Sequence, residues 1–297
     1  MQRLLFIYNR HAGKDRNWTS LSDIVGTMTG NGALVTAYPT QAPGDAGEAI
    51  VRWGADYDRI VVAGGDGTLN EAVSGLLRLP EKPPLGYIPI GSTNDFSKNL
   101  SLPAGVVEMA EVATNGQPRP CDVGRFNGRP FIYVAAFGAF VDVPFTTPQP
   151  IKNLLGYTAY LLESVRRLAF IRPHALRVEH DGGIIEGEYI YGMVSNTTSV
   201  AGLPNFPPGN PTLDDGLLEV TLITPPKDIL QLEQLGRALL LGDLVEEISM
   251  LQSFVTSRVK FHCEEALIWT LDGENGGQHR VGEVAVEPQA FTIVHGH

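Results

Sequence analysis

The sequence predicts an α/β domain with a doubly wound, mostly parallel sheet, followed by a mainly antiparallel β-sandwich domain with helical insertions. Three observations lead to this expectation. The chain has 297 residues, which suits two domains of ordinary size. Its first third alternates between strand-like and helix-like segments. The remainder is rich in short alternating strands that turn residues separate.

The N-terminal third accounts for the α/β domain. Apolar runs predict strands at 4–8, 33–38, 59–63 and 85–90, and helical spacing predicts helices at 17–29, 46–53 and 69–79. Because strands and helices alternate, we expect a mostly parallel sheet that helices cover on both faces.

The remainder accounts for the β-rich domain. Strands are predicted at 121–126, 130–136, 175–180, 184–194, 217–224, 255–263, 266–270, 282–286 and 290–294. Asn127-Gly128-Arg129 predicts a hairpin turn between the first two of these strands. Amphipathic spacing predicts helical insertions at 151–170 and 227–241. We place the domains at 1–120 and 121–287, with a C-terminal tail, 288–297, that can return to the first domain.

Composition and charge restrict the class of protein. The chain is 43% hydrophobic and carries a net charge of −11, and an acidic balance argues against nucleic acid as the main partner. Cys121 and Cys263 are far apart in the sequence and lack metal-type spacing, so we expect two reduced thiols. No apolar run approaches the ~20 residues of a transmembrane helix, and no signal segment is visible. We therefore expect a cytoplasmic protein without a transmembrane segment.

The strongest chemical signal is the glycine-rich segment Gly64-Gly65-Asp66-Gly67-Thr68, between a predicted strand and a predicted helix. Glycines let the backbone adopt positive φ and let a phosphate approach the N–H groups, and a helix beginning near Thr68 adds its positive dipole end. Asp66 would repel a phosphate unless a cation intervenes, which points to Mg²⁺ or to hydrogen bonds with a ribose or a neighbouring loop. A ligand-free βα turn is the alternative. The segment matches neither the Walker A nor the GxGxxG pattern.

Other polar residues follow predicted strands at the same edge of the sheet, where ligands bind in open α/β folds. Asn9 and Thr40 can contact a nucleotide or simply cap turns. Thr93 and Asn94 can hydrogen-bond a nucleotide, and Asp95 can cap a helix or join a metal or water network.

The turn Asp272-Gly273-Glu274 places two carboxylates around a glycine, a geometry that can direct both at one point. An acceptor hydroxyl needs a base of this kind, and a low-dielectric cleft can raise the pKa of a glutamate toward its working range. An exposed hairpin turn is the alternative.

Four motifs, in this order, resemble those of the bacterial diacylglycerol kinase-like lipid kinases, which are related to sphingosine kinases, NAD kinases and 6-phosphofructokinases. They are Gly64-Gly65-Asp66-Gly67-Thr68-Leu69-Asn70-Glu71, Pro89-Ile90-Gly91-Ser92-Thr93-Asn94-Asp95-Phe96, Asp214-Asp215-Gly216-Leu217 and Leu271-Asp272-Gly273-Glu274. The chain departs from the family at Asn9-Arg10, where Asn-Pro is usual, and at Ala201-Gly202-Leu203, where a glycine cluster near the acceptor site is thinned.

The resemblance implies an NAD kinase/phosphofructokinase-like N-terminal fold and a lipid kinase that uses ATP and Mg²⁺. Its acceptor would be a membrane lipid, with diacylglycerol converted to phosphatidic acid at the inner membrane surface, and its assembly a homodimer. The implied nucleotide-binding residues are Asn9, Thr40, Gly64, Gly65, Asp66, Gly67, Thr68, Glu71, Thr93, Asn94 and Asp95.

The resemblance also implies roles for two acidic turns. Glu274 would be the general base, and Asp272 would orient it or approach Mg²⁺. A structural cation would be held by Asp215 and by main-chain carbonyls near Thr212 and Leu217.

Two other functions stay open at this stage. An NAD kinase or another soluble-acceptor kinase shares the glycine-rich loop, and an open polar pocket in place of an apolar tunnel would favour it. A non-catalytic regulator is the third hypothesis, and the presence of both Asp66 and Glu274 ranks it last. The sequence does not choose among diacylglycerol, phosphatidylglycerol, sphingoid bases and long-chain alcohols as acceptors.

Overall fold

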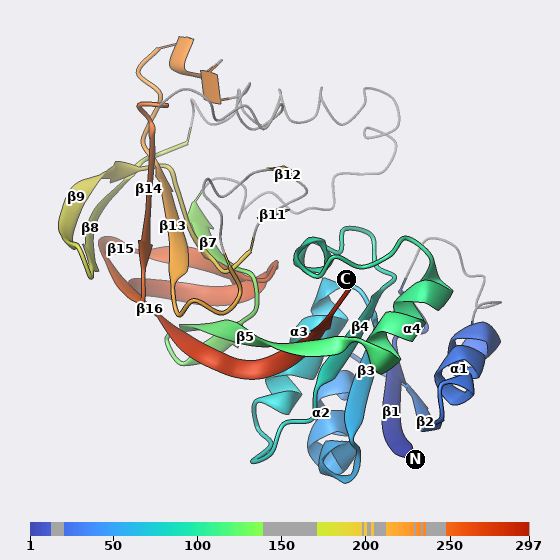
Figure 1. Ribbon diagram of the computed structural model, residues 1–297. Helices are drawn as coiled ribbons and strands as arrows, with labels where there is room; N and C mark the ends of the chain where they lie inside the picture. Colours follow the sequence, from blue (N-terminus) through green and yellow to red (C-terminus); the bar gives the residue numbers. More distant parts are fainter. Residues whose placement is uncertain are drawn as a thin grey trace. The chain divides into compact units, whose positions relative to one another are not determined.

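The computed structural model describes residues 1–12, 21–138, 171–197, 199–200, 203–204, 212–228, 230–232, 234–235 and 248–296. The chain forms two compact units (Figure 1). Unit 1 consists of Met1–Val123, Leu213–Asp215 and Glu287–His297, and unit 2 consists of Gly124–Thr212 and Gly216–Val286.

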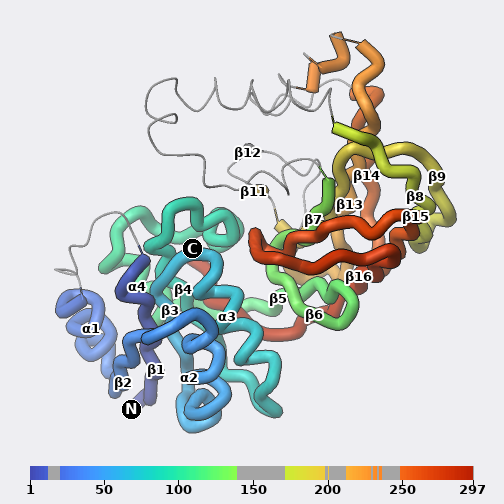
Figure 2. Tube along the Cα trace, turned by 180° about the vertical axis from the view of Figure 1, so that it is seen from behind, coloured from blue at the N-terminus to red at the C-terminus, as the bar shows by residue number. Residues whose placement is uncertain are grey.

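Unit 1 is built on parallel strands in the order β2-β1-β3-β4. Their bounds are β1 (Gln2–Tyr8), β2 (Ala33–Pro39), β3 (Arg59–Gly64) and β4 (Leu85–Pro89). The last strand, β16 (Glu274–His295), reaches this sheet at its end, where Ile293 pairs with Leu85 in parallel. In Figure 2 the C-terminus accordingly lies with unit 1.

Helices cover both faces of this sheet. They are α1 (Leu21–Gly30), α2 (Asp45–Trp53), α3 (Asp66–Leu76) and α4 (Val106–Asn115), with 3-10 turns η2 (Gly54–Asp56) and η3 (Phe96–Asn99). Helices α1 and α4 share one apolar cluster with Leu4 and Phe6 of β1. Leu5 and Ile7 are equally buried and point to the opposite face, because side chains alternate along a strand.

A close contact between two helices fixes α3, the helix that follows the glycine-rich loop. Gly47 of α2 and Gly75 of α3 face each other, and a Cβ atom on Gly75 would lie 2.4 Å from the Gly47 carbonyl oxygen. Only glycine permits this approach, so α3 packs against α2 backbone to backbone.

Unit 2 is antiparallel along the order β14-β13-β10-β7-β15-β16. Strand β15 pairs with β8 through Val259–Cys263 and with β7 through Trp269–Leu271, so one long strand serves two neighbours in succession. The strand bounds are β5 (Gln117–Phe126), β6 (Arg129–Phe131), β7 (Val134–Gly138), β8 (His174–His180), β9 (Gly183–Tyr189), β10 (Tyr191–Ser195), β11 (Ser199–Val200), β12 (Leu203–Pro204), β13 (Leu218–Ile223), β14 (Leu251–Thr256) and β15 (Arg258–Leu271).

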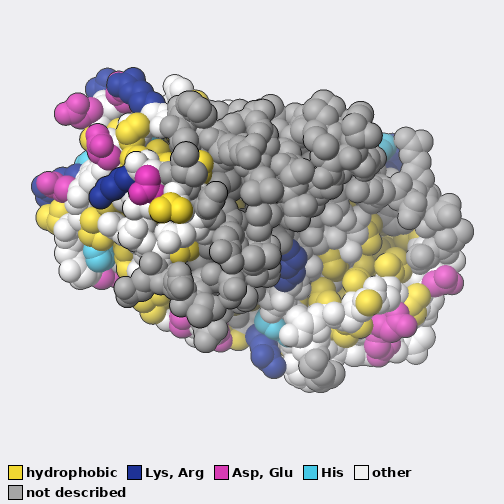
Figure 3. Space-filling model, turned by 90° about the horizontal axis from the view of Figure 1, so that it is seen from above, with side chains coloured by type: hydrophobic (Ala, Val, Ile, Leu, Met, Phe, Trp, Pro, Cys, Tyr) yellow, Lys and Arg dark blue, Asp and Glu magenta, His cyan; other side chains and the backbone are white. Residues whose placement is uncertain are grey.

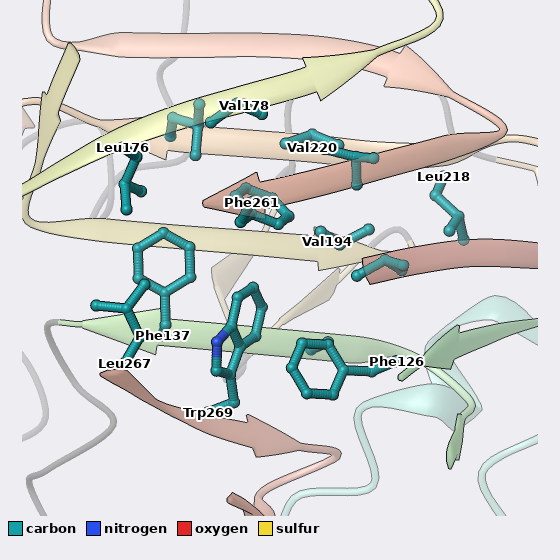
Figure 4. Close-up of a cluster of buried hydrophobic side chains, with 14 of the residues drawn as sticks. Phe126, Phe137, Leu176, Val178, Val194, Leu218, Val220, Phe261, Leu267 and Trp269 are labelled. Carbon is teal, nitrogen blue, oxygen red and sulfur yellow. The ribbon is translucent and has the colours of Figure 1, made fainter. Parts of the chain in front are cut away.

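The core of unit 2 centres on Trp269 (Figure 4). Its ring centroid lies 4.5 Å from that of Phe126, 4.8 Å from that of Phe137 and 5.3 Å from that of Phe261. Such tilted and edge-on aromatic contacts add to the free energy of burying the rings. The cluster therefore holds together the strands that lead to the turn at Asp272.

The predicted fold class is confirmed, and several individual elements differ from expectation. Helix α4 was not predicted. The strand predicted at 255–263 begins in β14, and its larger part joins 266–270 in the single strand β15, whereas 130–136 is interrupted between β6 and β7. The predicted helix at 151–170 lies outside the described residues, as does most of 227–241.

The described surface carries mixed charge. On the face shown in Figure 3, acidic and basic side chains are interspersed with hydrophobic ones. Within the described part of the chain, none of the helices has the length and apolar character that crossing a bilayer requires.

Candidate active site

The strands of unit 1 end in register at one edge of the sheet. The first residue after each strand continues the ladder: Asn9 N donates to Ala63 O at 2.9 Å, and Thr40 N donates to Tyr8 O at 3.0 Å. From β1 the chain moves outward to β2 and then returns to β3 on the other side. Ligands bind at this kind of reversal in open α/β sheets, so the candidate site lies at this edge.

The glycines of the loop allow neighbouring backbone segments to pack closely, and none of them adopts a positive φ. Gly65 has φ −91°, and no residue of Gly64–Thr68 has positive φ, so that expectation was wrong. A Cβ atom on Gly64 would lie 2.5 Å from Cβ of Thr68. A Cβ atom on Gly91 would lie 2.5 Å from Cα of Gly65, so the loops after β3 and β4 touch backbone to backbone.

Asp66 joins the two motifs. Helix α3 begins at this residue, three positions before the helix predicted at 69–79. The Asp66 carboxylate accepts hydrogen bonds from Asp95 N at 3.1 Å and from Phe96 N at 3.3 Å. Burial raises the pKa of Asp66, and the nearby Asp95 charge raises it further, while the amide donors oppose the shift. Hydrogen bonds of Asp66 thus connect the glycine-rich motif at 64–71 to the second motif at 89–96.

The second motif is held together by its own side chains. Asn94 has φ 52°, and its side chain closes the turn by accepting from Gly91 N and donating to Gly91 O, both at 2.9 Å. Asp95 is buried and forms an ion pair with Lys98 Nζ at 2.8 Å. Thr93 is exposed at the tip of the loop.

The remaining predicted nucleotide-binding residues divide into two groups. Asn9 Nδ2 donates to Thr68 Oγ1 at 3.2 Å, and Thr40 is buried beside the same strand end. Glu71 instead accepts a hydrogen bond from Ala46 N at 3.3 Å, and so satisfies one of the first N–H groups of α2.

Tyr87 is a supporting residue that sequence reasoning missed. This buried side chain of β4 donates its hydroxyl proton to Gly64 O at 3.2 Å, directly before the glycine-rich loop. Burial raises its pKa, as does the charge of Asp66, so the hydroxyl stays a donor. A tyrosine inside the otherwise apolar run 85–90 was the available signal.

The structure places the two carboxylates of the Asp272-Gly273-Glu274 turn in different surroundings. Asp272 is buried, and it accepts from Ile132 N at 2.7 Å and from the N atoms of Tyr133 and Val134 at 3.0 Å each. Glu274 is exposed. The expectation that both carboxylates point to one place is therefore not met.

The predicted cation site lies in the turn before β13. Thr212 and Asp215 are exposed, Leu217 is half-buried, and Gly216 has φ 73°. Among the described residues no three His, Cys, Asp or Glu side chains gather as a metal site. The predicted donors are one carboxylate and main-chain carbonyls, so the cation here stays a prediction.

Comparison with known proteins covers nearly the whole chain. Residues 3–126 match the diacylglycerol kinase catalytic domain model, and 146–295 match the YegS C-terminal NAD kinase beta sandwich-like domain model. A diacylglycerol kinase of Bacillus subtilis (strain 168) is 32% identical, over 93% of this chain and 91% of the relative. One of Staphylococcus carnosus (strain TM300) is 34% identical, over 93% of this chain and 90% of the relative.

Solved structures agree with the sequence comparison. The crystal structure of a diacylglycerol kinase from Bacillus anthracis str. Sterne has a TM-score of 0.84 at 27% identity, covering 99% of this chain and 97% of that one. With matching sequence motifs, matching domain models and a matching fold, the chain belongs to the diacylglycerol kinase family and is a kinase by family.

Proposed function

We propose that the protein is an ATP-dependent lipid kinase that transfers the γ-phosphate of ATP to a membrane lipid hydroxyl, with diacylglycerol as acceptor and phosphatidic acid as product. One observation supports nucleotide binding at this site: the Asp66 carboxylate binds the backbone of Asp95 and Phe96 at the carboxyl edge of the parallel sheet. Relatives named diacylglycerol kinase, aligned over nine-tenths of both chains, support the choice of acceptor.

The start of α3 supplies the phosphate contacts in this proposal. The first N–H groups of a helix lack intrahelical acceptors, and its dipole favours an anion at that end. Gly65, Gly67 and Thr68 lie at the start of α3, and Asn9 holds the Thr68 hydroxyl in place. A Cβ atom on Gly65 would lie 3.3 Å from Cα of Gly91, so this glycine lets the loop after β4 pack closely beside the start of α3.

The residues at this edge also fit Mg²⁺. Asp66 is half-buried, Asp95 is buried, and the nearby Asp95 charge is one cause of the raised pKa of Asp66. Oxygen donors of this kind suit Mg²⁺, and a divalent cation would add to the offset of negative charge that Lys98 already gives Asp95. When bound, Mg²⁺ neutralises charge on the triphosphate; Asp66 and Asp95 are the residues that we propose hold it.

Glu274 is the proposed general base. Its exposed carboxylate takes the proton of the acceptor hydroxyl, and the hydroxyl oxygen forms a bond to the γ-phosphorus. The bond from the γ-phosphorus to the bridging oxygen breaks at the same time, and ADP leaves with that oxygen. Because the acceptor resides in a bilayer, we also propose that the protein works in the cytoplasm at the inner membrane surface. From the family resemblance we further propose that it is a homodimer.

The test is transfer of labelled γ-phosphate from Mg-ATP to diacylglycerol in mixed micelles, with NAD assayed in parallel. Glu274→Gln keeps the size of the side chain and removes its basicity, and Glu186→Gln changes an exposed strand glutamate of the same unit as a control. We expect labelled lipid from the unmodified protein and from Glu186→Gln, and loss of label with Glu274→Gln.

Label in NAD alone would overturn the lipid proposal in favour of a soluble-acceptor kinase. Full activity of Glu274→Gln would leave the lipid kinase in place and remove the general base from it.

A further inference from the structure

We infer that Asp272 is a positioning residue: its carboxylate fixes the hairpin that carries Glu274, and it neither binds the metal nor takes the proton. The inference rests on the proposed role of Glu274 and sharpens it. The resemblance implies two alternative roles for Asp272, orienting Glu274 or approaching Mg²⁺. The geometry around Asp272 favours the orienting role.

Three successive backbone amides surround the Asp272 carboxylate. The N–H groups of Ile132, Tyr133 and Val134 all donate to it, at 2.7, 3.0 and 3.0 Å. Consecutive N–H groups that converge in this way form an anion-binding nest. These residues connect β6 to β7, and the nest explains why the strand predicted at 130–136 is interrupted there.

This arrangement uses most of the acceptor capacity of the carboxylate. An ionised carboxylate offers about four lone-pair positions, and the nest occupies three of them. The residue is also only 5% exposed. Three amide donors and near-complete burial together leave Asp272 badly placed to present its carboxylate to a metal or to a substrate proton.

The nest is coupled to Glu274 through a short turn. Asp272 and Gly273 have φ 50° and 82°, the two positive values of a two-residue type I′ hairpin loop. Leu271 pairs with Glu274 across this loop and with Ala135 of β7 on its other side. In addition, Asp272 N donates to Val134 O at 2.8 Å. The hairpin is therefore tied to β7 at Leu271 and at Asp272, and Glu274 lies two residues beyond the second of these ties.

Unit 2 contains a matched control for this carboxylate. Asp181, in the turn between β8 and β9, accepts from Ser257 N at 2.7 Å, Ser257 Oγ at 2.8 Å and Thr256 Oγ1 at 2.9 Å. It ties a hairpin turn to the connection between two other strands, as Asp272 does, but its turn carries no residue of the proposed site. Asp181→Asn therefore reports the cost of losing such a tie in general.

The experiment compares Asp272→Asn with Asp181→Asn by amide hydrogen exchange and by kinetics. In Asp272→Asn we expect faster exchange at Ile132–Val134 and a kcat lower by about 100-fold, the effect that a displacement of ~1 Å can have. The KM for Mg-ATP and the Mg²⁺ concentration at half-maximal rate should stay unchanged. In Asp181→Asn we expect faster exchange at Ser257 and an unchanged kcat.

Gly273→Ala is a second variant that leaves the carboxylate in place. Its Cβ atom meets no neighbour, so the substitution acts only through strain at φ 82°. We expect a lowered kcat with unchanged Mg²⁺ dependence here too.

A higher Mg²⁺ requirement in Asp272→Asn would show a metal ligand and overturn the inference. So would unchanged exchange at Ile132–Val134, or wild-type kcat in that variant. Absence of lipid phosphorylation by the unmodified protein would instead overturn the proposed function, and hydrogen exchange would still decide whether Asp272 anchors the hairpin.

Discussion

The side-chain amide of Asn9 donates a hydrogen bond to the hydroxyl of Thr68 at 3.2 Å, which joins the end of β1 to the first turn of α3. The side-chain oxygen of Asn9, Oδ1, accepts a second hydrogen bond from His11 N at 2.9 Å. The orientation of Asn9 is thus fixed from both sides. The glycine-rich loop is therefore held not only by its own strand but also by the strand beside it.

Asn9→Ala should weaken ATP binding. A hydrogen bond of this kind contributes roughly 1 kcal/mol, which corresponds to about fivefold in affinity. Calorimetric titration with ATP measures the change, and a double-mutant cycle with Thr68→Val isolates the shared contact. His11→Ala is the control, because it keeps the backbone N–H that contacts Asn9. Purely additive effects of Asn9→Ala and Thr68→Val would contradict the role of this contact.

Gly91→Ala should separate the two loops. The added Cβ atom would lie 2.5 Å from Cα of Gly65 and 2.7 Å from Oδ1 of Asn94, so the loops must move apart. We expect a loss of about 1–3 kcal/mol in stability, together with weaker ATP binding.

The matched control is Gly26→Ala in α1, where a Cβ atom meets nothing within 4 Å. Because alanine favours helices, this variant should gain about 0.5–1 kcal/mol. Thermal unfolding and ATP titration compare the two proteins, and equal behaviour of both would refute the close-packing explanation.

Arg59→Met should destabilise unit 1 without touching the candidate site. The buried guanidinium of Arg59 donates to the carbonyls of Ala113, Thr114 and Gly116, and so caps the C-terminus of α4 with a positive charge. Loss of these bonds should cost about 2–3 kcal/mol, and exchange should quicken first in α4. Arg78→Met, which removes only an exposed ion pair with Glu48, should change stability by less than about 0.5 kcal/mol.

Asp66 should make the protein less stable as the pH rises through the acid range. Burial raises the pKa of its carboxyl in the folded protein above 3.8, so the folded state binds this proton more tightly than the unfolded state. The stabilisation is present below 3.8 and is lost as the pH rises through the folded pKa. Asp66→Asn should therefore gain in melting temperature relative to the unmodified protein between pH 4 and neutrality, while losing activity. A difference that is independent of pH would contradict this assignment.

Asp181 should have the opposite dependence. Hydrogen bonds from Ser257 and Thr256 lower the pKa of this carboxyl to about 2 from 3.8. Its contribution to stability is therefore present above 3.8 and is lost as the pH falls toward 2. Melting temperatures of the unmodified protein and Asp181→Asn should converge over that interval, and parallel curves would show that these hydrogen bonds do not persist in solution.

The local order of the α/β unit was predictable because its signals are local. The runs at 4–8, 33–38, 59–63 and 85–90 are apolar and bounded by turn residues, and each is a strand of the observed sheet. Helix α4 was overlooked; its fully buried side chains, Ala110, Ala113 and Thr114, are small, and its larger apolar residues Val106 and Met109 are only partly buried.

The tertiary contacts of the candidate site were not predictable from spacing. That Asp66 binds the backbone of Asp95 and Phe96 depends on how β3 and β4 pair, and that Glu71 turns toward α2 depends on helix packing. The role of Asp272 depends on Ile132–Val134, which lie far from it in the chain. A motif names the residue types at a site, whereas the partners of each side chain follow from the fold.

The most direct test of the lipid-kinase assignment is to identify the products when the unmodified protein is incubated with Mg-ATP and diacylglycerol in mixed micelles. Mass spectrometry of the lipid and quantification of ADP should show phosphatidic acid and ADP formed in equal amounts. ADP without phosphorylated lipid, or phosphate transferred only to a soluble acceptor, would contradict the assignment.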